Sequence, residues 1–123
     1  MPTIVHFNLP ADDPERARLF YRELFGWKFE APPGFPDYYL VETEDLEGMP
    51  GIGGGMGKRE SPYQQITNYI GVSSVDEYLA KVESLGGKII LPKMPVPGFG
   101  NLAVCMDTEG NPFGLWQEET AVE

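Results

Sequence analysis

Apolar and polar positions follow the same order twice along the chain, and this pattern predicts two structural repeats. Between Ile4 and Lys28, an alternating apolar segment is followed by an acidic turn, a segment of helical periodicity and a glycine. The same order returns between Ile66 and Lys88. Alternation is typical of a half-buried strand, and spacings of three and four are typical of an amphipathic helix. Each repeat is therefore expected to begin with a strand and a helix.

The ends of both predicted helices carry recognisable signals. Asp13 precedes Pro14, a pair that suits a helix start, because an Asp side chain can accept a hydrogen bond from the free backbone N–H groups. Ser74 and Glu77 form a capping box at the start of the second helix. Gly26 and Gly86 are placed to end the two helices in a left-handed conformation.

Further strand-like segments follow each helix, separated by turns rich in proline and glycine. They span residues 27–30, 38–42 and 51–56 in the first repeat, and 88–91, 102–106 and 113–117 in the second. The fold class is therefore α+β, with two βαβββ modules forming a curved mixed sheet around a concave cup. We expect residues 1–123 to form a single domain built of modules 1–57 and 64–123, joined by a polar linker at 57–63.

The alternation also separates the two faces of each first strand. Under the helices we expect Val5, Phe7 and Leu9 in one repeat and Ile66, Ile70 and Val72 in the other. On the opposite face lie His6 and Asn8 in the first repeat and Thr67 and Tyr69 in the second. His6 thus corresponds to Thr67, and the chain contains no other histidine. A site that needs two imidazoles cannot be built within one subunit.

Composition excludes several classes of partner. The net charge of −10, with 9 Lys and Arg residues, disfavours binding to nucleic-acid phosphates. No apolar stretch approaches the roughly 20 residues needed to span a bilayer, and the N-terminus lacks the pattern of a secretion signal. Cys105 is the single cysteine and lies in an apolar run, so we expect a buried structural thiol. We therefore expect a cytoplasmic protein with no nucleic-acid or membrane partner.

Several longer motifs resemble one protein family. They are His6–Pro10, Asp13–Tyr21 and Leu24–Lys28 in the first repeat, and Val72–Asp76, Leu85–Lys88, Pro97–Gly100 and Asp107–Trp116 in the second. Together they resemble the vicinal oxygen chelate (VOC) superfamily, which includes glyoxalase I, bleomycin resistance proteins and extradiol dioxygenases, and in particular its lactoylglutathione-lyase-related branch. The resemblance implies a small-molecule ligand and a homodimer.

In metal-dependent members, the resemblance implies four ligand positions, on the first and last strands of each module. The first strands supply His6 and Thr67. The last strand of the second module supplies Gly114 where glyoxalases carry Glu, and the first module offers only Gly53, Gly54 or Gly55. His6 is the only matching ligand, so we expect no high-affinity metal and no cofactor. A weak divalent site recruiting His6 with a carboxylate is the alternative.

The candidate site residues follow from the predicted cup face. The catalytic candidates are His6, Glu42 and Glu118. The ligand-binding candidates are His6, Asn8, Tyr39, Thr67, Tyr69, Gly114 and Trp116. Each has a simpler interpretation, since His6 can be a polar lining residue, the aromatic side chains can be packing, and the glycines can mark a bulge.

Two functions remain open from the sequence. The first is a glyoxalase- or bleomycin-resistance-like protein that binds a small molecule and has a degenerate metal site. The alternative is a metal-dependent lyase or isomerase related to lactoylglutathione lyase. Dioxygenase chemistry is disfavoured, because a triad of two His and one carboxylate cannot be made with one His. A partner subunit without any ligand is a third class.

Overall fold

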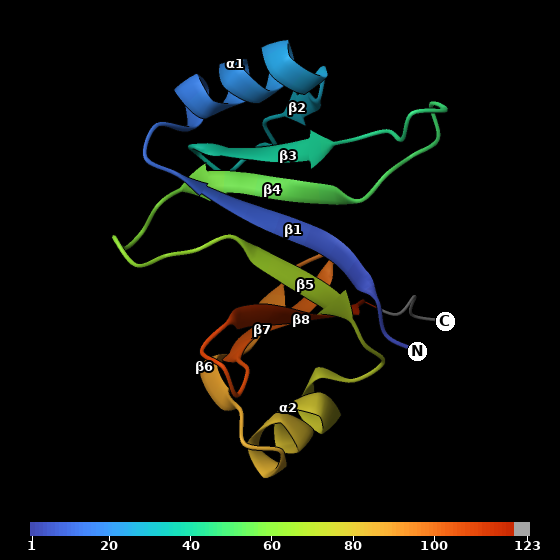
Figure 1. Ribbon diagram of the computed structural model, residues 1–123, viewed down its shortest axis with the longest axis vertical. Coiled ribbons are helices and arrows are strands. Elements are labelled where there is room, and N and C mark those ends of the chain that lie inside the picture. Colours follow the sequence, from blue (N-terminus) through green and yellow to red (C-terminus); the bar gives the residue numbers. More distant parts are fainter. Residues whose placement is uncertain (120–123) are drawn as a thin grey trace. The chain divides into compact units, whose positions relative to one another are not determined.

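The two predicted repeats form two compact units in the computed structural model, which describes residues 1–119. The first-repeat unit comprises His6–Ile66. The second-repeat unit joins Met1–Val5 to the chain from Thr67 onward. The boundary between the units lies inside the first strand, which therefore contributes residues to both (Figure 1).

The first-repeat unit has the order strand, helix and three strands. Its elements are β1 (Ile4–Ala11), α1 (Pro14–Phe25), β2 (Lys28–Glu30), β3 (Tyr38–Glu42) and β4 (Gly53–Lys58). The strands lie in the order β2-β3-β4-β1. β1 is parallel to β4, whereas β3 is antiparallel to both β4 and β2. Residues that lie opposite each other on β1 and β4 therefore have their side chains on the same face of the sheet.

The second-repeat unit has the same topology. Its elements are β5 (Thr67–Gly71), α2 (Val75–Ser84), β6 (Lys88–Val96), β7 (Gly100–Met106) and β8 (Pro112–Glu118). The strands lie in the order β5-β8-β7-β6, with β5 parallel to β8 and the other pairs antiparallel. The α+β class and the two βαβββ repeats are thus confirmed. The concave cup involves both units together and stays a prediction.

Both helices begin where the sequence predicts. The Asp13 side chain accepts a hydrogen bond from the Arg16 backbone N–H at 3.1 Å, and the Ser74 hydroxyl accepts one from the Glu77 N–H at 3.2 Å. Gly26 ends α1 with a φ of 75°, a conformation that glycine adopts without steric cost. Among residues 1–119, no helix is both long enough and apolar enough to cross a membrane.

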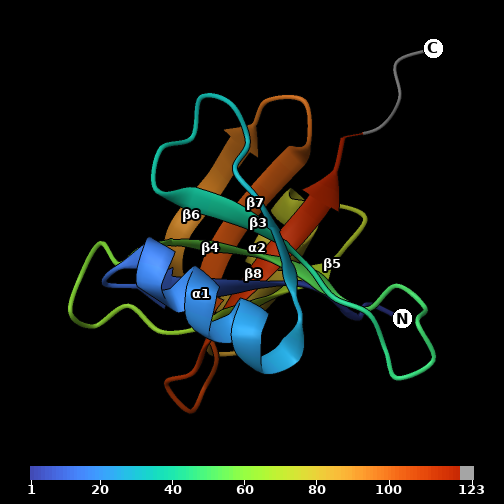
Figure 2. The same ribbon diagram turned by 90° about the horizontal axis from the view of Figure 1, so that it is seen from above.

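Seen from above, α1 lies across strands of its own unit (Figure 2). In each unit, residues of the helix and of the strands pack together in one hydrophobic core. The first-repeat core is built on Ala11, Val41 and Met56, with Phe7 and Leu9 among the side chains packed against it. The second-repeat core consists of Val75, Ala103, Cys105 and Leu115. Cys105 is fully buried, and burial raises the pKa of its thiol, which confirms the structural interpretation.

The structure differs from the sequence-based expectation at several places. Val5, predicted to lie under the helix with Phe7 and Leu9, is 41% exposed and is not part of the first-repeat core. Ile66, predicted to lie under a helix, precedes β5 and is 59% exposed. Gly57 and Lys58, predicted to begin the linker, belong to β4. β6 continues through Val96, beyond the predicted limit of residue 91, with two register irregularities along its pairing with β7. Its prolines are tolerated because β6 is an edge strand and can bulge.

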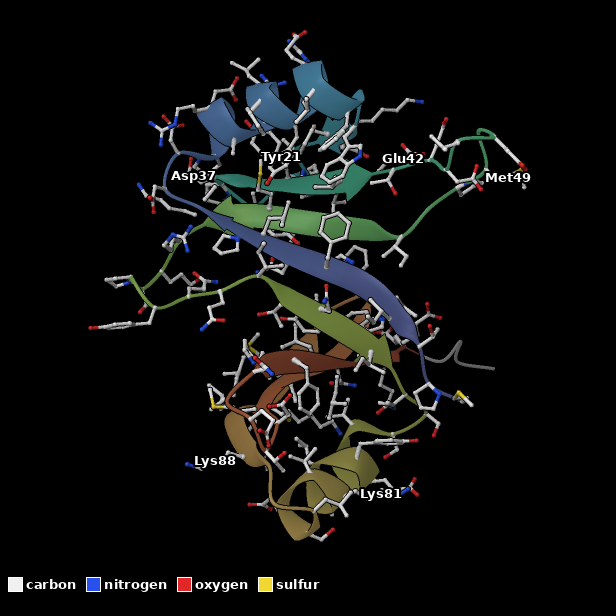
Figure 3. The ribbon with its side chains drawn as sticks, in the orientation of Figure 1. Tyr21, Asp37, Glu42, Met49, Lys81 and Lys88 are labelled. Atoms are coloured by element: carbon white, nitrogen blue, oxygen red, sulfur yellow. The ribbon has the colours of Figure 1, made fainter. Side chains whose placement is uncertain are left out.

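Met56 gives a direct test of the first-repeat core. Met56 is fully buried, whereas Met49 lies in the β3–β4 connection and is 59% exposed (Figure 3). Met56→Ala is expected to lower the free energy of unfolding by about 2–5 kcal/mol, because it leaves a cavity. Met49→Ala is expected to change it by less than about 0.5 kcal/mol. Urea unfolding measures both, and equal effects would show that the core is placed wrongly.

Candidate functional site

The face of the first-repeat sheet that points away from α1 carries the first group of candidates. β1 contributes His6 and Asn8. β4, which lies between β1 and β3, contributes Gly53, Gly55 and Gly57. On β3 the alternation places Tyr38, Leu40 and Glu42 on this face, because Val41 is in the core under α1. We call this surface the open face of the first-repeat unit. Figure 3 shows Asp37 and Glu42 at opposite ends of β3.

Strand register identifies the glycine that corresponds to Gly114. In the second repeat, Gly114 pairs with Tyr69, two residues after Thr67. In the first repeat, the residue two positions after His6 is Asn8, which pairs with Gly55. Gly55 is therefore the counterpart of Gly114. Its neighbour Gly54 faces the other way, where a Cβ atom would collide with the Phe7 ring under α1.

A tyrosine occupies the space above Gly55. Tyr38 comes from β3 opposite Gly57, and its side chain reaches back along β4, so a Cβ atom at Gly55 would overlap the Tyr38 hydroxyl. A Cβ atom at Gly57 would lie 3.1 Å from the Tyr38 ring. Burial raises the pKa of Tyr38, so its phenol stays protonated at neutral pH and can donate a hydrogen bond.

In the second repeat a tyrosine ring also lies over a glycine, but this tyrosine comes from the first strand of the repeat, β5. A Cβ atom at Gly114 would overlap the ring of Tyr69, which lies directly across from it on β5. Thr67 is on the same face and only 8% exposed. Trp116 and Glu118 follow Gly114 at two-residue steps on β8, so they share its face. Trp116 is half-buried, and Glu118 is exposed at the strand end.

These residues do not fit a metal centre of the glyoxalase kind. At both glycine positions there is no donor atom, and a tyrosine ring fills the space that a carboxylate side chain would need. Threonine at position 67 has no imidazole. Within residues 1–119, no group of three or more His, Cys, Asp and Glu side chains is arranged so that it could hold a metal ion.

His6 and Glu42 are the catalytic candidates on the open face. Desolvation lowers the pKa of His6 below its ordinary value of 6.5, so the imidazole is neutral at pH 7 and can act as a base. His6 pairs with Gly53, and Glu42 continues the same row on β3. Two strand spacings separate His6 from Glu42, about 10 Å between their backbones. The intervening Gly53 places no side chain between them.

A cavity of about 500 Å³ opens at the other end of this face. Asn8 and Gly57 form part of its floor, and the loop before β3 and the segment after β4 form its walls. The Tyr38 and Phe35 rings lie side by side with centroids 6.3 Å apart. Phe35 is 51% exposed, and Lys58 has no ion-pair partner among the residues the structure describes. We call this cavity the open-face pocket.

Tyr39 does not lie with the other candidates. Its hydroxyl donates a hydrogen bond to Glu15 of α1 at 2.6 Å, and its ring packs edge-on against Phe29. The strand alternation that buries Val41 turns Tyr39 toward the helix and Tyr38 toward the open face. Tyr39 is therefore a packing residue of the helix side, and Tyr38 takes the place expected for it.

The open-face pocket contains residues that the sequence reasoning did not select. Phe35 lies in a proline- and glycine-rich turn, and Lys58 lies at the predicted start of the linker. Asp37 precedes β3 with a φ of 56°, in the left-handed region that non-glycine residues rarely adopt. The only sequence signal for this site is an aromatic residue between Gly34 and Pro36, because an exposed ring in a turn lacks a packing role.

Comparisons with known proteins agree with the resemblance seen in the motifs. Residues 3–44 match a family model described as bleomycin resistance protein-like N-terminal. A glyoxylase-like domain-containing protein from Didymella fabae is 33% identical over 112 residues, which are 88% of this chain and 88% of that protein. The anthracycline biosynthesis protein DnrV from Streptomyces peucetius is 27% identical over 91% of this chain.

The chain spans about half the length of some of these relatives, including 46% of DnrV and 43% of a Mycobacterium tuberculosis protein that is 30% identical.

Solved structures show the same fold. A glyoxalase/bleomycin resistance protein/dioxygenase superfamily member from Vibrio splendidus superposes with a TM-score of 0.68, covering 96% of this chain and 100% of that one at 13% identity. Methylmalonyl-CoA epimerase from Streptomyces coelicolor, solved with 2-nitronate-propionyl-CoA, gives a TM-score of 0.67, covering 95% and 97% at 13% identity. From the repeated βαβββ topology, the first-strand motifs and the Didymella relative together, the chain belongs to the glyoxalase/bleomycin resistance protein/dioxygenase superfamily, the vicinal oxygen chelate superfamily.

Proposed function

We propose that this protein binds a flat, oxygen-bearing small molecule on the open face of its first-repeat unit, without a high-affinity metal ion or another cofactor. One observation carries the proposal: tyrosine rings occupy the space above Gly55 and Gly114, where the superfamily resemblance places carboxylate ligands. The chemistry offered there is aromatic surface and hydroxyl groups. Such a surface suits stacking and hydrogen bonding better than cation chelation.

The open-face pocket provides the matching contacts. Its volume of about 500 Å³ lies within the usual range for small-molecule sites. The exposed Phe35 ring and the half-buried Tyr38 ring supply flat apolar area. The Asn8 amide and the Tyr38 hydroxyl, both beside Gly55, can donate hydrogen bonds to carbonyl or hydroxyl oxygens. DnrV is named for anthracycline biosynthesis, and anthracyclines are flat fused-ring molecules that carry such oxygens.

The relatives that are about twice as long have room for two domains of this size. We accordingly propose that the chain forms a homodimer, which would bring two such domains together. The buried free thiol of Cys105 suits a reducing compartment, and we propose a cytoplasmic location on that basis.

A specific observation also supports a lyase or isomerase as the second candidate function. The row His6, Gly53 and Glu42 places a neutral imidazole and a carboxylate around a glycine without a side chain. A substrate lying over Gly53 would meet the His6 imidazole as a general base and the Glu42 carboxylate, a pair that can move a proton between adjacent carbons. The candidate Glu118 lies on the second-repeat unit and is not part of this row.

The tyrosine-over-glycine packing can be tested by a double-mutant cycle. Gly114→Ala is expected to cost about 1–3 kcal/mol of unfolding free energy, because the new methyl group overlaps the Tyr69 ring. In the Tyr69→Ala background the same change is expected to cost at least about 1 kcal/mol less, since the ring is gone. Urea unfolding of the four proteins gives the coupling energy. Additive effects would mean that the ring does not lie on Gly114.

Binding in the open-face pocket can be tested with 1,8-dihydroxyanthraquinone as the probe. We expect saturable binding in a fluorescence titration, weakened about 3- to 10-fold by Phe35→Ala, the equivalent of one lost ring contact. Phe99→Ala is the matched control, because Phe99 is similarly exposed, at 57%, but lies in the second-repeat unit outside this pocket. Equal weakening by both substitutions, or by neither, would count against this site.

The enzyme alternative makes a separate prediction for His6. If the protein is a lyase, hemithioacetal turnover with added zinc, nickel or manganese should fall at least about 100-fold in His6→Ala, because the only imidazole is lost. Wild-type turnover should be retained above the lowered pKa of His6 and should decline as the pH falls through that pKa, because the imidazole is then protonated. Wild-type turnover no faster than that of His6→Ala would exclude this function.

A further inference from the structure

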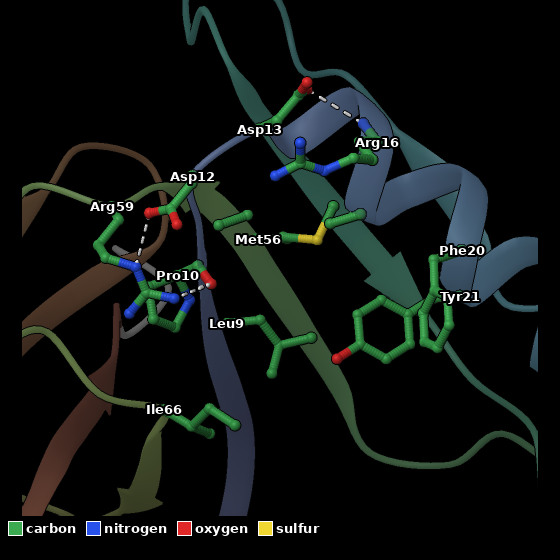
Figure 4. Close-up of a pocket in the computed structure, with 12 residues that line it drawn as sticks. Leu9, Pro10, Asp12, Asp13, Arg16, Phe20, Tyr21, Met56, Arg59 and Ile66 are labelled. Carbon is green, nitrogen blue, oxygen red and sulfur yellow. Dashed lines mark hydrogen bonds and ion pairs between the residues drawn. The ribbon is translucent and has the colours of Figure 1, made fainter. Parts of the chain in front are cut away.

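A second cavity lies on the opposite side of the first-repeat sheet, between the N-terminal half of α1, the end of β1 and the segment that leads to Ile66 (Figure 4). Its volume is about 490 Å³, which is large enough for a small molecule. Leu9, Phe20, Met56 and Ile66 supply its apolar wall. Leu9 follows Asn8 on β1, and alternate residues of a strand face opposite sides, so this cavity is separate from the open-face pocket. We call it the helix-side pocket.

Most charged groups around the helix-side pocket are already engaged in holding the fold. The Arg59 guanidinium donates to Asp12 at 2.9 Å, to the Gln64 carbonyl at 2.6 Å and to the Pro10 carbonyl at 3.4 Å. Asp13 caps α1 by accepting from the Arg16 backbone N–H. Figure 4 shows the contacts of Arg59 with Asp12 and Pro10 and the contact of Asp13 with Arg16. Both carboxylates are thus compensated, one by a guanidinium and one by the helix N-terminus.

The Arg16 side chain is different. Arg18 and Arg22, the other arginines of α1, form ion pairs with Glu15 and Glu23. Arg16 has no ion-pair partner within the described part of the chain, and its side chain lines the cavity. Tyr21 adds a hydroxyl group on the side of Leu9 (Figure 4), and stacking on Trp27, with centroids 5.1 Å apart, holds its ring in place.

We propose that the helix-side pocket is a second binding site, for a compact monocarboxylic acid with an apolar body. The ligand carboxylate pairs with the Arg16 guanidinium, a donor whose planar fork suits two carboxylate oxygens. The body lies against Leu9, Phe20, Met56 and Ile66, where it shields the exposed Phe20 and Ile66 side chains from water.

Charge decides between ligand classes at this site. Among the described residues that line the cavity, Arg16 is the charged side chain that is not compensated. Because Arg16 is a cation, an anionic ligand is complementary to it and a cationic ligand is not. A single guanidinium matches a single negative charge. The chain carries a net charge of −10, which repels a multiply charged phosphate ester more strongly than a monocarboxylate.

Octanoate and 1-octanol provide a matched pair of probes, since they share an alkyl chain and only octanoate is charged. Calorimetry is expected to show saturable octanoate binding that Arg16→Gln weakens at least about 10-fold, the loss of a charge-assisted pair. Arg22→Gln is the control, because Arg22 is on the same helix but outside the cavity, and it should leave octanoate binding unchanged. 1-Octanol binding should be insensitive to Arg16→Gln. Phe20→Ala should weaken both probes.

Amide chemical-shift mapping locates the bound octanoate. Shifts at Leu9, Phe20 and Ile66 support the proposal, whereas shifts at Phe35 and Tyr38 would place octanoate in the open-face pocket and overturn it. Equal octanoate affinity in wild type and Arg16→Gln would also overturn it, as would the absence of saturable binding. If the Phe20 and Ile66 signals instead change with protein concentration alone, a second copy of the chain covers this cavity and the proposal is wrong. None of these outcomes depends on whether the open-face pocket binds its flat probe.

Discussion

Packing of a tyrosine ring onto a glycine is the contact on which the chemistry of both repeats depends. Tyr38 lies over Gly55 and Tyr69 lies over Gly114, so the two repeats share this feature although the rings come from different strands. A glycine in a strand interior weakens the strand unless something packs on it. Here the ring uses the space, and any side chain at the glycine would have to displace it. The same contact therefore explains both why these positions have no donor atoms and why they present aromatic surface.

This contact explains why a fold known for chelating cations can present a different surface here. In the absence of carboxylates at the two glycines, His6 has lost the neighbours that would share a cation with it. Burial lowers the pKa of its imidazole, which is then neutral at pH 7 and can act as a base. The open face thus has two titratable groups in one row, His6 and Glu42, with the Tyr38 hydroxyl and ring over the next glycine, Gly55.

The sequence was sufficient for the order of elements, the helix starts and the helix-facing positions of Phe7 and Leu9 on β1. Periodicity and capping are local, so they can be interpreted without knowing the neighbours. The prediction selected Tyr39 instead of Tyr38 for the open face, because the two adjacent tyrosines differ only in strand phase. That phase is fixed by Val41, whose burial against α1 is a tertiary contact. The prediction for Ile66 was wrong for a related reason. Ile66 precedes β5, so no pairing with a neighbouring strand fixes the direction of its side chain.

The two pockets could not be predicted because loops form their walls. The segments 34–37 and 59–66 have no periodicity, and their positions depend on contacts far apart in the chain. Arg59 is the clearest example, because it connects Asp12, 47 residues away, with the nearby Gln64 carbonyl.

Arg59 also determines which groups are left to recognise a ligand. It lines both cavities, but its hydrogen bonds hold the segment after β4 against the end of β1. A ligand that took this guanidinium would have to break those bonds, and the loss of the cavity walls would offset the gain. At the two proposed sites, selectivity would then come from side chains that do not hold the fold in this way, Asn8 and Phe35 on the open face and Arg16 on the helix side. Because strand alternation sends Asn8 and Leu9 to opposite faces, a substitution at one pocket can leave the other intact, and the two sites can differ in ligand chemistry while sharing one anchoring arginine.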